Sequence, residues 1–584
     1  MLFNSYIFIF LFFPICLLGF YGLKQKNSTL AKVWLTGFSL WFYGYFNIRY
    51  LCIMIFSILL NYGVYQLMMR VERGSSVSGA ADKNADVEVD STFICVRSKQ
   101  KKMILITGVS ANLLLLFYFK YYDFFVENIN AVFGSSLVLK NVLLPLGISF
   151  FTFQQISFLA DTYRGELKNC SFLDYALFVS FFPQLIAGPI VTHEEMLPQF
   201  HEIGKKKWNE EEFVRGLFIF VLGMGKKVLI ADTFGIAVDA GYGMVAELGS
   251  IDAILVMLFY TLQLYFDFSG YCDMAIGIGK MMGIEIPINF NSPYKACNII
   301  DFWKRWHITL SRFFTKNIYI PLGGNRKGQG RMYANLFFVF FLSGVWHGAG
   351  WNYIFWGVMH GVLYCVTRWL QVRKRTRDEQ KEEKGSTEQN ASANPETALY
   401  IRENAAGQNE YVEQGMDSYT ETKAARQNQT VYTESKTTVK NWCLKGVISS
   451  RIIQVVKVLL TFIYVNIAWV FFRSESIEQA LTLFKRMFIG GIALPVEVIY
   501  DAFNLDEFWY VMKVLHLTDF AYSNYILMVL FTVVILLVTF FGKNVHELAK
   551  RWKMSGISAV VIAVVFIWCV VSLSGVSTFL YFNF

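Results

Sequence analysis

The sequence predicts an all-α, polytopic membrane protein, and both its composition and its hydropathy support that fold class. Of its 584 residues, 55% are hydrophobic and 17% are charged, whereas soluble globular chains carry about 25% charged residues. The mean hydropathy is +0.40, and apolar runs long enough to span a bilayer recur along the chain. This composition excludes a disordered chain, a nucleic-acid-binding basic domain and a disulfide-stapled secreted module. The 9 cysteines are scattered without the spacing of a redox or zinc motif, so no metal site is predicted.

The first apolar run covers residues 2–23 and is long enough to cross a membrane. It lacks a basic leading region and a small-residue cleavage site, so we expect a retained helix rather than a signal peptide. Lys24, Lys26 and Lys32 follow it. Because positive loops stay inside, we expect this loop in the cytoplasm and the N-terminus outside.

Further apolar runs bring the expected total to about eleven to thirteen membrane elements, some of them re-entrant or broken. Glycine, proline and polar residues interrupt the apolar runs at residues 144–148 and 182–189. Such backbone survives at membrane depth only when it is buried in protein or lines a cavity, so we expect a thick helical body with an internal cavity. The runs after the first are 33–46, 50–69, 103–126, 141–160, 172–190, 213–238, 253–283, 333–350, 352–370, 451–472, 523–541 and 556–575.

One block of the chain looks soluble. Residues 371–440 hold 11 Lys or Arg and 12 Asp or Glu and show no apolar periodicity. We expect residues 371–445 to form a flexible insert, and its strongly basic leading edge places it in the cytoplasm. The predicted organisation is a membrane core at 1–370, this insert, and C-terminal membrane helices at 446–584.

Histidine is rare, with 7 in the chain, and an ionisable group at membrane depth costs a few kcal/mol, so His307 is a candidate functional residue. Neutral imidazole is suited to general acid–base chemistry near neutral pH. At helical spacing, His307 shares one stripe of residues 301–314 with Trp303, Leu310 and Phe314. The pattern predicts an amphipathic interfacial helix with a buried histidine. A purely anchoring helix fits the spacing equally well.

A second histidine, His347, stands inside an apolar run between Trp346 and Trp351, with glycines at 344, 348 and 350. Glycines permit close backbone approach, so we interpret this stretch as the floor of a reaction chamber. The alternative is a hydrogen-bonded core histidine at a helix break. His360, in residues 356–361, is more consistent with close helix packing.

Two further stretches carry polar groups in apolar surroundings. Asp267 and Asp273 do not share a helix face, and we expect each to pair with a basic residue or cap a broken helix, although an ion path is the functional alternative. Residues 321–331 are basic and glycine-rich but lack P-loop spacing. They predict a cytosolic turn. The alternative is a site that binds an anionic donor group, such as a phosphate of coenzyme A.

Taken together, these motifs resemble the membrane-bound O-acyltransferase family, and within it the bacterial branch that O-acetylates alginate. They occur in the family's order and are jointly specific. The motifs are FPQLIAGPI at 182–190, DFSGYCDMAI at 267–276, FWKRWHITLS at 302–311, YIPLGGN at 319–325, VWHG at 345–348 and FLYFNF at 579–584.

The resemblance implies a ring of tilted helices around a central funnel that holds the active site. It also implies that His347, in the WHG motif, is catalytic and that His307, in the RWH motif, is the second signature residue. Five further residues in or beside these motifs are candidates for substrate binding. They are Trp346, Asn352, Trp303, Arg305 and Asp267.

The function implied is transfer of an acyl group, expected to be acetyl, across the cell membrane to a hydroxyl of a cell-surface or exported polysaccharide. The donor is a cytoplasmic thioester, acetyl-CoA or an acyl carrier, acting as co-substrate with no bound cofactor. The acceptor hydroxyl belongs to the glycan or to an extracellular acetyltransferase partner that relays the group, and His347 is the expected general base. D-alanyl transfer to teichoic acid is the alternative. A transporter fits less well, because the chain shows no pair of interrupted repeat helices.

Overall fold

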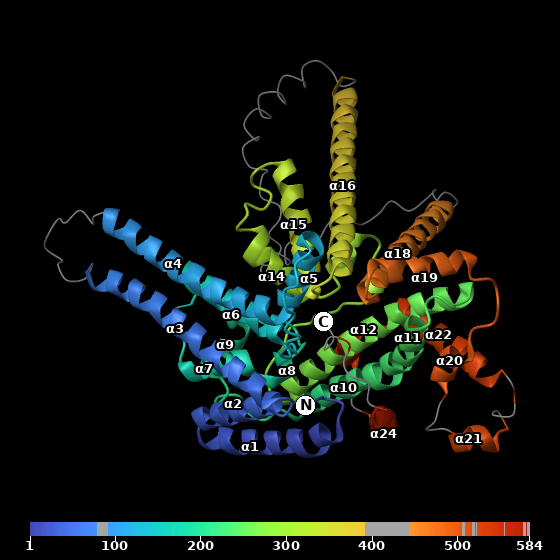
Figure 1. Cartoon of the computed structure of the whole chain (residues 1–584), viewed down its shortest axis with the longest axis horizontal. Coiled ribbons are helices and arrows are strands. Elements are labelled where there is room, and N and C mark those ends of the chain that lie inside the picture. Colours follow the sequence, from blue (N-terminus) through green and yellow to red (C-terminus); the bar gives the residue numbers. More distant parts are fainter. Residues whose placement is uncertain are drawn as a thin grey trace. The chain divides into compact units, whose positions relative to one another are not determined.

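The computed structural model describes residues 1–78, 91–167, 169–391, 443–504, 509–516, 520, 522–553, 555–575 and 580. Throughout these residues every regular element is a helix, which confirms the predicted all-α fold class (Figure 1). Two compact units are present, Met1–Tyr364 with Val458–Phe584, and Cys365–Lys457. Both signature histidines belong to the first unit.

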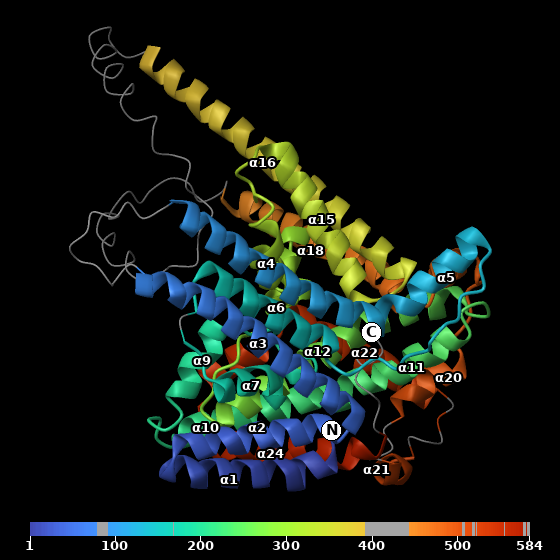
Figure 2. The ribbon, with the colours of Figure 1, turned by 60° about the vertical axis from the view of Figure 1, so that its left-hand side comes forward.

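The N-terminal helices form two packed pairs. The first is η1 (Phe8–Phe12) with α1 (Phe13–Lys26) against α2 (Ser28–Gly44), and Asn27 between α1 and α2 accepts a hydrogen bond from Thr29 N at 2.7 Å. The second is α3 (Ile48–Ser78) beside α4 (Ser91–Leu116), which lie side by side in Figures 1 and 2. Helix α4 runs on through the π-helical turn η2 (Phe117–Tyr121) into α5 (Tyr122–Phe133).

Short and broken helices occupy the middle of the unit, as the interrupted motifs predict. They are α6 (Ile148–Arg164), α7 (Phe172–Ser180), α8 (Phe182–Leu185) and α9 (His193–His201); the first three are largely buried, and α9 buries one face. Next come α10 (Glu210–Gly225), the π-helical turn η3 (Lys226–Ala231), α11 (Asp232–Gly243) and the long α12 (Ser250–Met281).

Helices α10 and α12 pack with their backbones in contact, and glycines make this possible. A Cβ on Gly223 would lie 2.8 Å from the Gly270 carbonyl oxygen, and one on Gly277 would lie 2.7 Å from the Gly216 carbonyl oxygen. The close approach places η3 beside the buried carboxylates of α12. Lys226 Nζ lies 2.7 Å from Asp273, and Lys227 Nζ lies 2.7 Å from Asp267. The expected pairing of both aspartates with basic residues is therefore confirmed.

The remaining elements include those that carry the two signature motifs. Helix α15 ends at His347, and α16 begins four residues later. In order, the elements are η4 (Pro293–Lys295), α13 (Ile299–Trp303), α14 (Ile308–Phe314), η5 (Thr315–Tyr319), α15 (Gln329–His347), α16 (Trp351–Ala391), α18 (Cys443–Arg473), α19 (Ile477–Ile489), α20 (Glu497–Tyr500), η6 (Asp501–Phe503), α21 (Trp509–Val514), α22 (Ser523–Phe541), α23 (Val545–Arg551), α24 (Gly556–Val571) and η8 (Ser572–Gly575).

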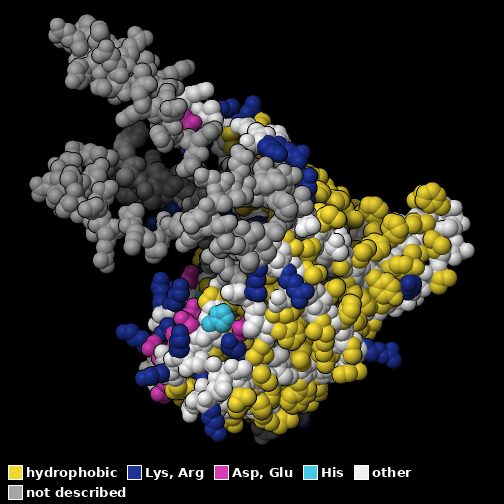
Figure 3. All heavy atoms as spheres, turned by 90° about the vertical axis from the view of Figure 1, so that its left-hand side faces the viewer, with side chains coloured by type: hydrophobic (Ala, Val, Ile, Leu, Met, Phe, Trp, Pro, Cys, Tyr) yellow, Lys and Arg dark blue, Asp and Glu magenta, His cyan; other side chains and the backbone are white. Residues whose placement is uncertain are grey.

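Within the described residues, 6 helices are long and apolar enough to cross a membrane. The other expected apolar runs fall on shorter or interrupted helices; the run at 213–238, for example, is divided among α10, η3 and α11. Figure 3 shows a broad hydrophobic face, with the charged side chains gathered toward one end of it. The six helices are Phe8–Lys26, Ile48–Arg73, Ser98–Phe133, Ser250–Met281, Arg451–Arg473 and Ser523–Phe541.

The predicted insert differs from expectation where the structure describes it. Helix α16 continues to Ala391, so residues 371–391 are helical rather than a loop. This stretch is rich in Arg, Lys, Glu and Gln, which are good helix formers, and Arg375 pairs with Glu379 one turn away at 2.9 Å. The central part of the predicted insert, residues 392–442, lies outside the described residues.

Candidate active site

His347 is the last residue of α15, and aromatic rings enclose it. Its side chain is buried, with 4% of the residue exposed. Its ring centroid lies 4.8 Å from that of Trp346, 5.0 Å from Trp356 and 5.1 Å from Phe472. The histidine therefore occupies an apolar enclosure built from α15, α16 and α18.

Glycines set the crossing of α15 and α16 that makes this enclosure. A Cβ on Gly344 would lie 2.5 Å from the Tyr353 carbonyl oxygen, and one on Gly357 would lie 2.6 Å from the Phe340 carbonyl oxygen. A Cβ on Gly348 would lie 2.2 Å from the Tyr353 ring. The glycines around His347 thus permit close backbone approach, as the sequence predicts.

His307 is fully buried but does not lie within a helix, so the predicted amphipathic helix over 301–314 is wrong. The segment forms two helices, α13 and α14, and His307 stands between them at φ +46°, in the left-handed region. The break is stabilised from elsewhere in the chain, because the Asn289 carbonyl accepts a 3.0 Å hydrogen bond from Ile308 N. A tertiary contact of this kind leaves no trace in helical periodicity.

Asn289 orients the His307 ring, and sequence reasoning missed it. Thr309 donates to its side-chain oxygen through the backbone N–H at 3.2 Å and the hydroxyl at 2.9 Å, which identifies that atom as Oδ1. The same oxygen lies 3.3 Å from His307 Nδ1. Since an amide oxygen only accepts, Nδ1 carries the hydrogen and Nε2 keeps its lone pair. An amide between two apolar residues, Ile288 and Phe290, shortly after the long apolar run was the available sequence signal.

Trp346 joins the two histidines into one site. Its ring centroid lies 4.8 Å from His347 and 6.2 Å from His307. Phe150 and Phe268 complete the wall beside His307, the latter at 4.9 Å. His307 Nε2 is buried and has no hydrogen-bond partner among the described residues. Such an atom is expensive to leave unpaired, so it is available for a bound molecule.

The other sequence-predicted residues make contacts with protein groups. Trp303 Nε1 donates to His360 Nδ1 at 3.4 Å, and His360 packs among aromatic rings, in agreement with its expected packing role. Arg305 pairs with Asp301 at 2.8 Å. Substrate contact by Trp303 and Arg305 stays a prediction.

Asn352 and Asp267 both hold chain segments in place. Asn352 Nδ2 donates to the carbonyls of Phe471, at 3.3 Å, and Ser474, at 2.7 Å, and so caps the end of α18. Asp267 accepts a hydrogen bond from Leu580 N at 3.0 Å in addition to its ion pair with Lys227. Their role in substrate binding also stays a prediction.

A cavity of about 140 Å³ reaches Thr309, two residues after His307 in the chain. Thr309 lines it and, on its other side, donates to Asn289. Charged pairs edge the cavity, among them Arg312 with Glu195. The lining residues are Ser157, Ile190, Val191, Thr192, Glu194, Glu195, Thr309, Arg312, Phe313, Lys316 and Asn317.

A buried carboxylate, Asp161, ties the elements around this cavity together. It lies 2.7 Å from Arg164, 2.9 Å from His193 Nδ1 and 3.0 Å from Lys316 Nζ. Burial raises the pKa of Asp161, but hydrogen bonds and charges from His193 and Lys316 outweigh this effect and hold the pKa below its usual value.

Across the described residues, no group of three or more His, Cys, Asp or Glu side chains forms a metal site.

Comparison with known proteins finds one family model and several related proteins. The family model for the membrane-bound O-acyltransferase family matches residues 91–390. A peptidoglycan O-acetyltransferase of Helicobacter pylori is 36% identical over 100% of this chain and 98% of its own length. A probable alginate O-acetylase of Pseudomonas putida is 39% identical over 63% of this chain and 71% of its own. A teichoic acid D-alanyltransferase of Bacillus subtilis is 32% identical over 38% of this chain and 58% of its own.

The helical body with its apolar spans and the match to the family model define a multi-pass membrane acyltransferase. The chain belongs to the membrane-bound O-acyltransferase family. The resemblance carried by the WHG and RWH motifs is therefore confirmed. The relatives named as a peptidoglycan O-acetyltransferase and a probable alginate O-acetylase also agree with the expected O-acetylation branch.

Proposed function

We propose that this protein transfers an acetyl group from a cytoplasmic acyl thioester to a hydroxyl of a cell-surface polysaccharide, with peptidoglycan as the first acceptor to test. The observation that carries the chemistry is the pair of buried histidines whose rings both lie next to that of Trp346. Similarity to a peptidoglycan O-acetyltransferase along the whole chain supports the acceptor.

His347 acts as the general base in this proposal. It takes the proton of the acceptor hydroxyl while the hydroxyl oxygen attacks the thioester carbonyl carbon. The carbon–sulfur bond then breaks, and the leaving thiolate takes the proton back from the imidazolium. The products are an ester and a free thiol. The aromatic enclosure excludes water, which would otherwise hydrolyse the thioester.

His307 positions a substrate group in the same step. With its Nδ1 hydrogen directed at Asn289, its Nε2 can accept a hydrogen bond from an N–H or O–H group of the substrate. The cavity beside Thr309 supports entry of the thioester on this side, because Thr309 lines it and shares the Asn289 side chain with His307.

The proposed topology places the N-terminus outside and the insert at 371–445 in the cytoplasm, following the positive-inside rule. The donor then arrives from the cytoplasm and the acceptor from outside. The acceptor hydroxyl is either that of the glycan or that of a serine on an extracellular acetyltransferase partner. Purification of the protein from cells with its bound proteins distinguishes these two routes.

Deletion of the gene tests the proposal. Base-labile acetate released from purified peptidoglycan is expected to fall in the deletion strain and return when the gene is restored. The ester-linked D-alanine of teichoic acids is measured in the same cells. Loss of that ester with unchanged acetate would instead support the D-alanyl transferase function suggested by the Bacillus subtilis relative. Unchanged acetate in every envelope glycan contradicts the proposal.

A further inference from the structure

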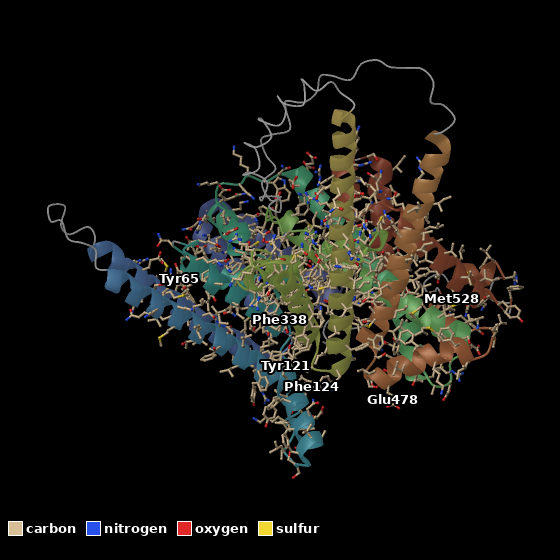
Figure 4. All side chains as sticks on the ribbon, turned by 90° about the horizontal axis from the view of Figure 1, so that it is seen from above. Tyr65, Tyr121, Phe124, Phe338, Glu478 and Met528 are labelled. Carbon is tan, nitrogen blue, oxygen red and sulfur yellow. The ribbon has the colours of Figure 1, made fainter. Side chains whose placement is uncertain are left out.

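The end of α15, which carries His347, is held by side chains from a different part of the chain. Tyr121, labelled in Figure 4, donates through its hydroxyl to the Val345 carbonyl at 2.9 Å. Lys120 donates through Nζ to the carbonyls of Trp346, at 2.7 Å, and His347, at 3.0 Å. Both side chains come from η2, the π-helical turn between α4 and α5. Three consecutive carbonyls are therefore capped by two neighbouring residues.

These carbonyls need partners because of where the helix stops. The last four carbonyls of any helix have no partner within it, and such groups cannot stay unpaired away from water. Gly348, the residue after His347, is extended at φ −161° and ψ 155°. The chain thus leaves the helix directly after His347, and the caps come from η2.

A lysine suits this position because the C-terminal end of a helix carries partial negative charge. Lys120 lies within the apolar span Ser98–Phe133, where an ionisable side chain is costly unless it has a specific partner. No carboxylate among the described residues lies within ion-pair distance of Lys120. Its charge is matched instead by the two carbonyls and by the Trp346 ring, whose centroid is 5.8 Å from Nζ.

We propose that Lys120 is a positioning residue for His347, holding the end of α15 so that the imidazole and Trp346 keep their places in the enclosure. This inference rests on the proposed role of His347 as general base. Misplacement of a catalytic group by about 1 Å costs roughly 10²-fold in rate. A lysine that only anchored α4 in the membrane would lack the bond to the backbone of His347 itself.

Three variants test the proposal. Lys120→Met removes both carbonyl bonds and keeps the length of the side chain, whereas Lys120→Arg keeps a cation that can donate to both. Lys140→Met is the matched control, because Lys140 stands near the same turn over the rings of Tyr118 and Tyr122, at 4.8 and 4.5 Å. If Lys120→Met fails to fold, Tyr121→Phe removes the neighbouring cap with the loss of one hydroxyl.

The first measurement does not depend on the acceptor. Purified protein in detergent is treated with diethyl pyrocarbonate, which modifies neutral imidazole, and the rate at His347 is read by mass spectrometry. We expect faster modification of His347 in Lys120→Met, by about threefold or more as the last turn of the helix opens. Modification of His307 serves as the internal reference. Lys120→Arg and Lys140→Met should react like the unsubstituted protein.

The second measurement is base-labile acetate in complemented deletion cells. We expect base-labile acetate to be about 10- to 100-fold lower in Lys120→Met cells than in cells with the unsubstituted protein. Lys120→Arg should restore part of the acetate, and Lys140→Met should leave it unchanged. If Lys120→Met matches Lys140→Met in the modification rate of His347, or in acetate content where the gene deletion itself lowers acetate, the inference is overturned. If the gene deletion itself leaves acetate unchanged, the proposed function fails while the His347 modification rates still decide the positioning role.

Discussion

At the scale of single residues, the site depends on one amide that has no chemical role of its own. Asn289 accepts hydrogen bonds from Thr309 and directs the Nδ1 hydrogen of His307, so that Nε2 of His307 keeps its lone pair. It also donates to Cys272 Sγ at 3.5 Å, which fixes the amide against α12. The Asn289 amide thus fixes the orientation of the His307 imidazole.

Replacing His347 with alanine is expected to lower base-labile acetate by about 10²- to 10⁴-fold, the typical contribution of a general base. The measurement compares deletion cells that carry each variant at equal protein levels in the membrane. His201→Ala is the matched control, because His201 is half exposed and pairs with Asp174 away from the aromatic enclosure. Full acetate in His347→Ala cells contradicts the proposed base.

Replacing Asn289 with leucine leaves His307 and Thr309 without their acceptor. We expect a loss of about 1–3 kcal/mol of stability, the cost of buried donors that lack a partner, together with reduced acetyl transfer. The apparent melting temperature in detergent and the acetate content measure the two effects. Asn291→Leu, two residues away and exposed, is the control, and equal behaviour of the two variants refutes the role of Asn289.

At the scale of elements, backbone contact between helices decides where the histidines stand. The crossing of α15 and α16 has no room for a side chain at Gly344, and the junction of α6, α9 and η5 closes around the Asp161 carboxylate. Neither junction contains a group that reacts. The first shapes the aromatic enclosure, and the second holds Lys316, which lines the cavity beside Thr309.

Substitution of Gly344 by alanine is expected to force α15 and α16 apart, because its Cβ would lie 2.5 Å from the Tyr353 carbonyl oxygen. Overpacking of this kind costs about 1–3 kcal/mol. A lowered melting temperature and reduced acetate would both follow. Gly330→Ala, in the first turn of the same helix, should be neutral or slightly stabilising, because the added Cβ would meet nothing within 4 Å. Equal melting temperatures of the two variants contradict the prediction.

Asp161→Asn is expected to destabilise the protein by about 3–5 kcal/mol near neutral pH, because it leaves Lys316 and Arg164 beside a neutral amide. The pKa of the carboxyl is held below its usual value, so its contribution is complete above that value and is lost as pH falls through the lowered pKa. The difference in melting temperature from the unsubstituted protein should therefore shrink in acid. Glu166→Gln, at the exposed edge of the same cluster, is the control; a difference independent of pH contradicts this account.

At the scale of the whole molecule, local patterns predict much of the fold but little of the site geometry. The apolar run at 523–541 coincides with α22, and both aspartates of α12 pair with basic residues as expected. Hydropathy identifies such features because bilayer length and charge cost are local properties. The regular stripe of 301–314 predicts a continuous helix through His307, yet the helix breaks through a contact with Asn289, which lies outside that stripe. The helical state of residues 371–391 is missed because α16 extends by propensity and not by an apolar stripe.

The glycine contacts between α10 and α12 have a consequence for how the chain tolerates change. Gly216, Gly223, Gly270 and Gly277 carry no functional group, yet a methyl at any of them meets backbone or side-chain atoms of the opposite helix within 3 Å. In a saturation library selected for envelope acetylation, these four inert positions should accept as few replacements as the histidines do. The sequence would then be constrained at these positions by the need for no side chain, as strictly as it is at the histidines by their chemistry.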